Sequence, residues 1–363
     1  MPLAESTLLE ALKTVVDANT GKDFVTTKQL RNLRIEGGDV AFDVELGYPA
    51  KSQIAGLRKA LIAAARSVSG VENVSANLST KIVAHAVQRG VQLLPKVKNI
   101  VAVASGKGGV GKSTTAVNLA LALAAEGAAV GILDADIYGP SQPMMMGIEG
   151  RPDSADGKTM EPMENYGVQV MSIGFLVEAD NPMIWRGPMV TQALEQLLRQ
   201  TNWHDLDYLI VDMPPGTGDI QLTLCQKVPL TGAVIVTTPQ DIALLDAKKG
   251  LKMFEKVGVP ILGVVENMAV HVCEKCGHVE HIFGSDGGKK MAEQYNVDYL
   301  GALPLNLSIR EQADAGRPTV VSDPDGEIAQ IYKAVARQLA VKIAIKAKDF
   351  SSKFPTITVS KTT

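Results

Sequence analysis

Residues 105–114 read SGKGGVGKST, and this stretch decides the fold of the chain. It matches the pattern G-x-x-x-x-G-K-[ST]. An apolar run at 100–104 precedes it and an alanine- and leucine-rich segment follows it, which together predict a strand, a loop and a helix. Four glycines between positions 106 and 111 let successive backbone N–H groups converge on phosphate oxygens. The start of the helix adds unpaired donors and about half a positive charge, so we predict a phosphate-binding loop here.

The same stretch also matches the dinucleotide fingerprint G-x-G-x-x-G, with Asp134 and Asp136 roughly 20 residues further on as ribose acceptors. A dinucleotide needs neither a lysine nor a hydroxyl at the start of the helix, whereas a triphosphate with its Mg²⁺ needs both. Lys112 would contact the β- and γ-phosphates, and Ser113 would ligate Mg²⁺. We therefore predict an ATPase that uses ATP and Mg²⁺. The predicted nucleotide-binding residues of the loop are Gly106, Lys107, Gly108, Gly109, Val110, Gly111, Lys112, Ser113 and Thr114.

Two other apolar segments end in carboxylates. Asp212 follows the apolar residues 209–211 and precedes MPPGTG, which is typical of a second Mg²⁺-side carboxylate followed by a sensor of the γ-phosphate. Asp134 and Asp136 follow another apolar segment, and one of them can orient the attacking water. We favour Asp136 for this role, because Asp134 is explained equally well as a loop cap.

A second lysine in the loop, Lys107, is not required for simple phosphate binding. Because Lys112 already fills the cis position, we expect Lys107 to point across a subunit boundary and neutralise transition-state charge, as an arginine finger does. The sequence therefore predicts an ATP-dependent dimer in which Lys107, Lys112 and Asp136 are catalytic.

The pattern of apolar residues divides the chain into two units. Residues 1–80 combine amphipathic helices with alternating strands and predict a small α+β domain, whose strands at 30–36 and 40–46 are joined by a Gly37-Gly38 turn. Residues 81–98 are predicted as a linker, 99–348 as the ATPase domain and 349–363 as a disordered tail. From residue 99, continuous apolar strands alternate with helices, which predicts an α/β fold with a mostly parallel sheet flanked by helices. The strands expected there are 100–104, 129–133, 208–211, 233–236 and 261–265, and the helices include 114–126 and 246–257.

Composition excludes several classes of function. Among 363 residues, 36 Lys and Arg stand against 39 Asp and Glu, so no basic surface for nucleic acid is indicated, and 4% aromatic residues disfavour stacking on single strands. No apolar run approaches the roughly 20 residues that span a bilayer, and the first residues do not resemble a signal peptide. Three cysteines cannot form a disulfide framework. We expect a cytoplasmic protein that binds neither nucleic acid nor membrane.

Cys273 and Cys276 form a C-x-x-C pair after the apolar segment 261–265. Four interpretations compete: half of an intersubunit iron–sulfur site, a zinc site that adds His278 and His281, a redox dithiol, and an inert turn. The histidines lie closer to the cysteines than in a zinc finger, and a redox motif should follow an early strand of a thioredoxin-like unit. Two thiolates supply half of a four-coordinate site, which a symmetric dimer would complete. We favour the iron–sulfur site, with zinc still open. The third cysteine, Cys225, has an apolar helical context and is expected to be a buried small hydrophobe.

Seven stretches together make the chain resemble the Mrp/ApbC family of iron–sulfur cluster carrier ATPases. Several of them would also fit the wider group of deviant Walker A P-loop NTPases, which includes nitrogenase iron protein, MinD and ParA. WRGP and the cysteine pair narrow the resemblance. The stretches are 105–114, DADIYGPS at 134–141, WRGP at 185–188, DMPPGTGD at 212–219, TTPQ at 237–240, ENM at 266–268 and C-x-x-C at 273–276.

The resemblance implies a homodimer that carries a 4Fe-4S cluster bridged by Cys273 and Cys276 of each chain. It also implies transfer of the cluster to apo-proteins, with ATP binding or hydrolysis as the switch. The lysine matching Lys107 would contact the nucleotide of the partner subunit, and the aspartate matching Asp136 would position the attacking water. Two further positions come from the resemblance: Asn267, which would read adenine, and Pro304, which would line the adenine pocket.

Residues 1–80 resemble the small iron–sulfur assembly domain often fused ahead of bacterial members. The usual Asp-Pro-Glu after the first helix is replaced by Asp17-Ala18-Asn19, and the domain contains no cysteine, so it cannot ligate a cluster through thiolates. Two alternatives to a cluster carrier stay open at this point. One is a positioning or partition-type ATPase in which the cysteines are incidental, and the other is a zinc-stabilised regulatory ATPase.

Overall fold

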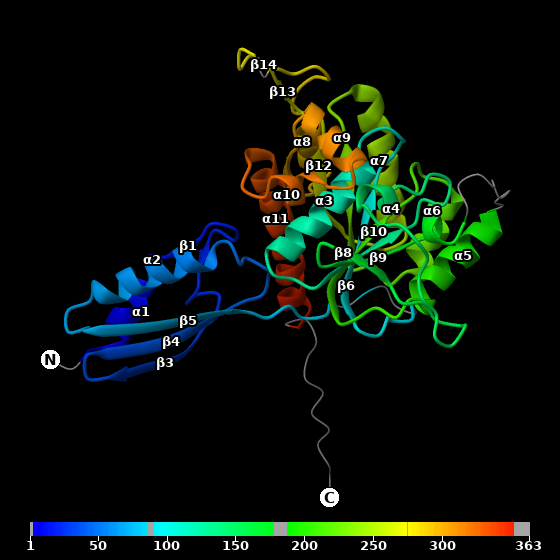
Figure 1. Cartoon of the computed structure of the whole chain (residues 1–363). Helices are drawn as coiled ribbons and strands as arrows, with labels where there is room; N and C mark the ends of the chain where they lie inside the picture. Colours follow the sequence, from blue (N-terminus) through cyan, green and yellow to red (C-terminus); the bar gives the residue numbers. More distant parts are fainter. Residues whose placement is uncertain (1–2, 86, 88–90, 178–186, 274, 352–363) are drawn as a thin grey trace, which may run out of the picture.

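The computed structural model describes residues 3–85, 87, 91–177, 187–273 and 275–351. It shows a small N-terminal unit beside a larger unit built on a central sheet (Figure 1). The elements of the N-terminal unit are α1 (Glu5–Lys13), β1 (Val16–Asp17), β2 (Lys22–Asp23), β3 (Leu30–Glu36), β4 (Asp39–Leu46), α2 (Ile54–Arg66) and β5 (Asn73–Thr80).

The N-terminal unit is the predicted α+β arrangement. The turn at Gly37 has a φ of +63°, which glycine adopts without strain, and it joins β3 to β4 as an antiparallel hairpin. β5 pairs with β4 in parallel, so the chain must cross over the sheet between them, and α2 makes this crossover. Leu8, Leu12 and Leu61 from the two helices are fully buried and form part of the core of this unit.

The larger unit contains an eight-stranded sheet in the order β15-β12-β11-β6-β10-β7-β9-β8. Every neighbouring pair is parallel except β8 with β9, which confirms the predicted fold class. The strands of the larger unit are β6 (Val97–Ala104), β7 (Val130–Asp134), β8 (Met163–Asn165), β9 (Val168–Ser172), β10 (Leu206–Asp212), β11 (Gly232–Thr237), β12 (Ile261–Glu266), β13 (His271–Val272), β14 (Val279–Glu280) and β15 (Tyr299–Ala302).

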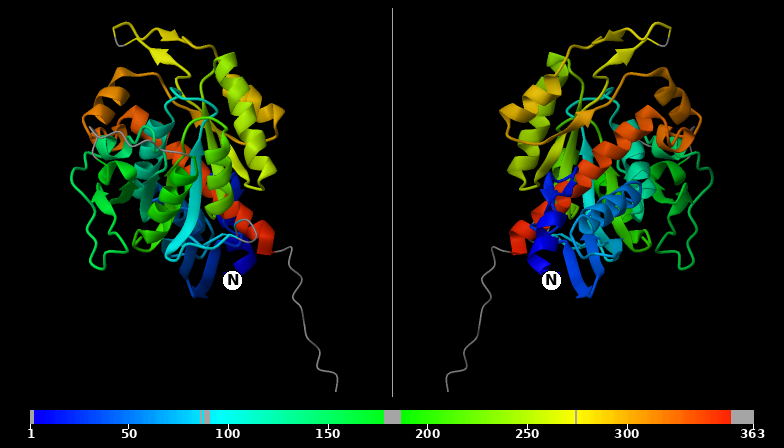
Figure 2. Two further views of the ribbon diagram at one scale, coloured as in Figure 1. Left: turned by 90° about the vertical axis from the view of Figure 1, so that its right-hand side faces the viewer. Right: turned by 90° about the vertical axis from the view of Figure 1, so that its left-hand side faces the viewer.

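Helices cover both sides of this sheet (Figure 2). α3 packs against α10 and α11, while α5, α6, α7 and α8 pack against one another in sequence. The central strands β7 and β11 are buried along their whole length, as their continuous apolar sequences predict. The helices are α3 (Lys112–Ala125), α4 (Gln142–Met145), η1 (Ile173–Phe175), α5 (Gly187–Gln200), α6 (Asp219–Lys227), α7 (Asp241–Lys256), α8 (Gly287–Gln294), α9 (Leu307–Asp314), α10 (Thr319–Ser322) and α11 (Glu327–Ser351).

Three element ends differ from the prediction by more than two residues. β6 begins at Val97, inside the predicted linker, because it pairs with β10 from Leu206 onward. α7 begins at Asp241 rather than at 246, since the turn after β11 leads directly into it. α11 continues to Ser351, past the predicted end of the ATPase domain at 348, and residues 352–363 of the predicted tail lie outside the described residues.

The two units are joined through Glu126, which is 2% exposed and follows α3 directly. The backbone N–H and the hydroxyl of Ser52 donate to its carboxylate at 3.0 and 2.7 Å. Arg337 of α11 forms an ion pair with the same carboxylate at 2.6 Å. The helix that begins at the phosphate-binding loop therefore ends at the N-terminal unit.

Candidate functional site

The predicted phosphate-binding loop joins β6 to α3 at the carboxyl ends of the parallel strands. A Cβ atom at Gly106 would collide with the backbone of Asp246 in α7, so this glycine is required by packing. Gly111 has a φ of +77°, and a Cβ there would collide with the side chain of Asn267. A Cβ at Gly108 or Gly109 would meet no atom within 4 Å, which leaves that part of the loop open toward a ligand.

Lys112 is the central cation of the site and is 6% exposed. Its Nζ donates to Asp212 Oδ1 at 2.5 Å and to Ser113 Oγ at 3.0 Å, and it lies 4.0 Å from Asp136 Oδ2. The fold therefore brings the predicted phosphate-binding lysine, both predicted Mg²⁺ ligands and the predicted water-orienting carboxylate together. Burial is the largest influence on the pKa of Asp136 and raises it, while the Lys112 charge opposes this rise.

Two interpretations were offered for Asp134, and its hydrogen bonds fit the loop cap. Its fully buried carboxylate accepts hydrogen bonds from the backbone N–H groups of Asp136, Ser141 and Gln142 at 3.2, 3.0 and 3.1 Å, and from Ser172 Oγ at 3.1 Å. Burial raises the pKa of Asp134, and the neighbouring charge of Asp212 adds to the rise. Three of these contacts hold the backbone between Asp136 and Gln142, and the fourth ties it to β9, so Asp134 shapes the loop.

The two positions expected near adenine lie on neighbouring segments. Asn267 follows β12, is buried, and donates from Nδ2 to the carbonyl of Val110 in the loop at 2.8 Å. The segment that contains Pro304 follows β15, and Leu303 next to it donates to the carbonyl of Glu266 at 2.8 Å. Asn267 thus contacts the phosphate-binding loop directly, and its role toward a nucleotide stays a prediction.

Lys107 lies in the open part of the loop and is partly exposed. Ser105 Oγ donates to its backbone carbonyl at 2.8 Å, which orders the loop there. Its ammonium group forms no ion pair with any residue in the described part of the chain, so it is available to another ligand or chain.

The cysteine pair lies in a projecting hairpin made by β13 and β14, at the top of Figure 1. Cys273 is partly exposed and Cys276 is exposed, and the backbone N–H of Cys273 donates to the carbonyl of His278 at 2.9 Å. The backbone N–H groups of Lys275 and Cys276 lower the pKa of the Cys273 thiol, which favours the thiolate that binds metal.

The hairpin does not gather the four residues of the zinc interpretation. His281 Nδ1 lies 3.0 Å from the carbonyl oxygen of Ala269, and His278 Nε2 lies 3.8 Å from Glu280 Oε1. Among the described residues, no three His, Cys, Asp or Glu side chains are grouped so as to hold a metal ion. Cys225, on α6, is buried as expected, and burial raises the pKa of its thiol to about 12.

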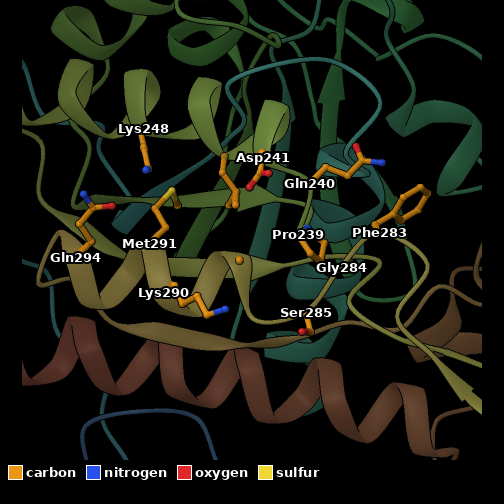
Figure 3. Close-up of a pocket in the computed structure, with 12 residues that line it drawn as sticks. Pro239, Gln240, Asp241, Lys248, Phe283, Gly284, Ser285, Lys290, Met291 and Gln294 are labelled. Carbon is orange, nitrogen blue, oxygen red and sulfur yellow. The ribbon is translucent and has the colours of Figure 1, made fainter.

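A separate cavity of about 490 Å³ lies between α7 and α8 (Figure 3). Lys248 and Lys290 extend into it from the two helices, with Met291 between them. Part of its wall is the segment 283–285, which follows the cysteine hairpin in the chain. None of the predicted site residues lines this cavity.

Sequence reasoning missed Gln142, which is fully buried and donates to Asp212 Oδ2 at 2.8 Å. The only signal in the sequence was its place directly after the stretch 134–141. Trp185 and Arg186 of the predicted WRGP stretch lie outside the described residues. No helix in the described part of the chain is both long and apolar enough to cross a membrane.

Comparisons with known proteins agree with this geometry. Residues 96–340 match the family described as NUBPL iron-transfer P-loop NTPase, and residues 5–77 match the family described as iron-sulfur cluster assembly protein. The iron-sulfur cluster carrier protein of Pseudomonas fragi is 62% identical over 272 residues, which cover 74% of this chain and 95% of that protein.

Solved structures show the same fold. A nucleotide-binding protein from Archaeoglobus fulgidus, in complex with ADP, is 37% identical with a TM-score of 0.56, and the match covers 64% of this chain and 90% of that one. The cell division ATPase MinD of Pyrococcus furiosus is 22% identical with a TM-score of 0.51, over 66% of this chain and 98% of that one. The second likeness concerns the fold alone.

Proposed function

Because the chain belongs to the NUBPL iron-transfer P-loop NTPase family, we propose that it is an ATP-dependent iron–sulfur cluster carrier. It binds and hydrolyses ATP with Mg²⁺, holds a 4Fe-4S cluster between the two chains of a homodimer, and passes the cluster to apo-proteins. The proposal includes a reducing compartment such as the cytoplasm, because cluster ligation needs reduced thiolates.

The observation that carries the proposal is the projecting hairpin with Cys273 and Cys276. Two thiols at the surface, with no third metal-binding side chain grouped with them among the described residues, fit a site completed by a second copy of the chain. The lowered pKa of Cys273 favours its ligand form. Because the MinD likeness concerns the fold alone, this hairpin is the feature that favours a carrier over a positioning ATPase.

The residues around Lys112 fit Mg²⁺ and phosphate. The Ser113 hydroxyl and the Asp212 carboxylate are hard oxygen donors of the kind that Mg²⁺ takes, and they would hold the ion. Bound Mg²⁺ supplies neutralisation of phosphate charge. Phosphate oxygens compete with Asp212 for the Lys112 ammonium group, so nucleotide binding exchanges one ion pair for another.

Asp136 is the residue proposed to orient the attacking water. Its carboxylate is only 14% exposed and its pKa is raised by burial, which makes it a better proton acceptor than a solvated aspartate. Lys107, which is free of ion pairs with the described residues, would reach the nucleotide of the partner subunit. Asn267 and Pro304 are proposed to lie near the adenine, because Asn267 contacts the loop at Val110 and the segment of Pro304 is bonded to Glu266, next to Asn267 in the chain.

Anaerobic reconstitution with iron and sulfide tests the carrier function. We expect about four iron and four sulfide per dimer, together with a doubled mass in light scattering. The variant with Cys273→Ser and Cys276→Ser should bind no cluster and stay at the smaller mass. Cys225→Ala is the matched control and should behave like the wild type, because Cys225 is buried on another element. Stoichiometric zinc without iron in the wild type would favour the zinc-stabilised regulator and end the carrier proposal.

A further inference from the structure

Gln142 lies fully buried between the two residues proposed to hold Mg²⁺. Its Nε2 donates to Asp212 Oδ2 at 2.8 Å and to the backbone carbonyl of Ser113 at 3.2 Å. Both neighbours are acceptors, so the amide nitrogen must face them and the amide oxygen must face away. That oxygen, Oε1, is buried and has no hydrogen-bond partner among the residues that the structure describes.

The backbone of Gln142 is held in place independently of its side chain. Its N–H donates to Asp134 Oδ2 at 3.1 Å, and its carbonyl accepts from the N–H of Met146 at 2.9 Å. Asp134 also binds the N–H of Ser141, so the start of α4 is attached to the end of β7. The amide therefore approaches Asp212 from a rigid support.

Both oxygens of Asp212 are occupied, one by Lys112 and the other by Gln142. When phosphate oxygens compete for the Lys112 ammonium group, Oδ1 loses its partner while Oδ2 keeps the amide of Gln142. The remaining hydrogen bond keeps the carboxylate facing Ser113, whose backbone the same amide also holds. Partners of this kind, which orient a metal ligand without binding the metal, have a large influence on metal affinity.

We propose that Gln142 is a positioning residue for the Mg²⁺ of the bound nucleotide. It fixes the Asp212 carboxylate through Nε2, and the same amide nitrogen holds the Ser113 backbone beside it. Mg²⁺ demands near-ideal octahedral geometry, so a carboxylate ligand that is held in one orientation favours its binding. The inference rests on the proposed nucleotide function and goes beyond it by adding a residue that no sequence pattern indicated.

The test separates nucleotide binding from Mg²⁺ binding. Binding of a fluorescent ADP analogue is measured first with a chelator and then in a Mg²⁺ titration, for the wild type, Gln142→Met and Gln142→Glu. Methionine keeps the unbranched shape without the amide, and glutamate keeps an acceptor but loses the donor to Asp212. We expect unchanged metal-free binding and an apparent Mg²⁺ affinity weaker by about tenfold or more in both variants. Circular dichroism checks that each variant is folded. The Mg²⁺ titration of one folded variant is enough to test the role of Gln142.

Gln221→Met is the matched control. Gln221 is also buried, its Nε2 donates to the carbonyl of Pro214, and its Oε1 is likewise unpaired within the described residues, but it does not contact Asp212. Its Mg²⁺ titration should match the wild type. Wild-type Mg²⁺ affinity in the Gln142 variants, or an equal loss in Gln221→Met, would overturn the proposal. Failure of the wild type to bind the metal-free analogue would instead overturn the nucleotide site itself, and the Gln142 role with it.

Discussion

Lys112 links the charges of the candidate site, because one buried ammonium group faces two carboxylates. It is bonded to Asp212 and lies 4.0 Å from Asp136. The Lys112 charge lowers the pKa of Asp136 against the larger effect of burial. Removing Lys112 therefore removes the predicted phosphate contact and also leaves the buried Asp212 carboxylate without its cation.

Lys112→Ala and Asp136→Ala should separate binding from turnover. Lys112→Ala should abolish ADP binding, because Lys107, the other cation of the loop, is proposed to contact the nucleotide of the partner subunit instead. Asp136→Ala should bind ADP like the wild type while kcat falls by about 10²- to 10⁴-fold, the usual contribution of a positioned acid or base. Calorimetric titration and phosphate release measure the two properties. Equal turnover in the wild type and both variants would contradict the assignment of both residues.

α3 is the element that connects the nucleotide site with the N-terminal unit. It begins at Lys112 and is followed directly by Glu126, whose carboxylate binds Ser52 from the N-terminal unit and Arg337 from α11. A single buried carboxylate thus attaches two other parts of the chain to one end of the helix.

Glu126→Ala should destabilise the protein by about 3–5 kcal/mol, because it leaves Arg337 without its partner in a largely buried position. Urea unfolding measures this change, and hydrogen exchange should show faster exchange at the Ser52 N–H, which loses its acceptor. Glu10→Ala removes the exposed ion pair with Lys13 and is the control, expected to change stability by about 0.5 kcal/mol or less. If Glu126→Ala lowered the free energy of unfolding no more than Glu10→Ala does, the stabilising role of this contact would be refuted.

The candidate functional residues of the molecule form two groups near one edge of the central sheet. The phosphate-binding loop, Asp136 and Asn267 follow β6, β7 and β12. Asp212 is the last residue of β10, so all four meet at the carboxyl edge of the parallel strands. The cysteine hairpin follows β12 and projects beyond that edge (Figure 1). Within the described range 3–80, the N-terminal unit contributes no residue to either group, and it is attached to the larger unit through Glu126.

ADP should stabilise the N-terminal unit as well as the ATPase domain. At 100 times its Kd, a ligand that binds only the folded state adds about 2.7 kcal/mol. Because α3 connects the loop with Ser52, ADP should slow amide hydrogen exchange in peptides from residues 50–60 as well as in peptides from the loop. Lys112→Ala should remove both effects. Protection of the loop alone would show that the two units open independently.

Much of the fold and part of the site could be predicted from local sequence. Strands β6 and β7 are visible in the sequence as continuous apolar runs. The phosphate-binding loop can be recognised because all of its glycines lie within a few residues of one another. The sequence favoured Asp136 over Asp134 for orienting the water, but it left two interpretations open for Asp134. Both follow the same strand, and only the packing of Ser172 and the start of α4 against Asp134 identifies it as the loop cap.

The sequence by itself determined the phosphate-binding loop, the parallel α/β sheet and the exposed cysteine pair, because these depend on neighbouring residues and on a period of apolar side chains. Tertiary structure alone decided that Gln142 contacts Asp212 and that Ser52 contacts Glu126. Their partners lie 70 and 74 positions away along the chain. No local pattern records contacts at such separations, because they form only when parallel strands and the helix between them bring distant segments to one place.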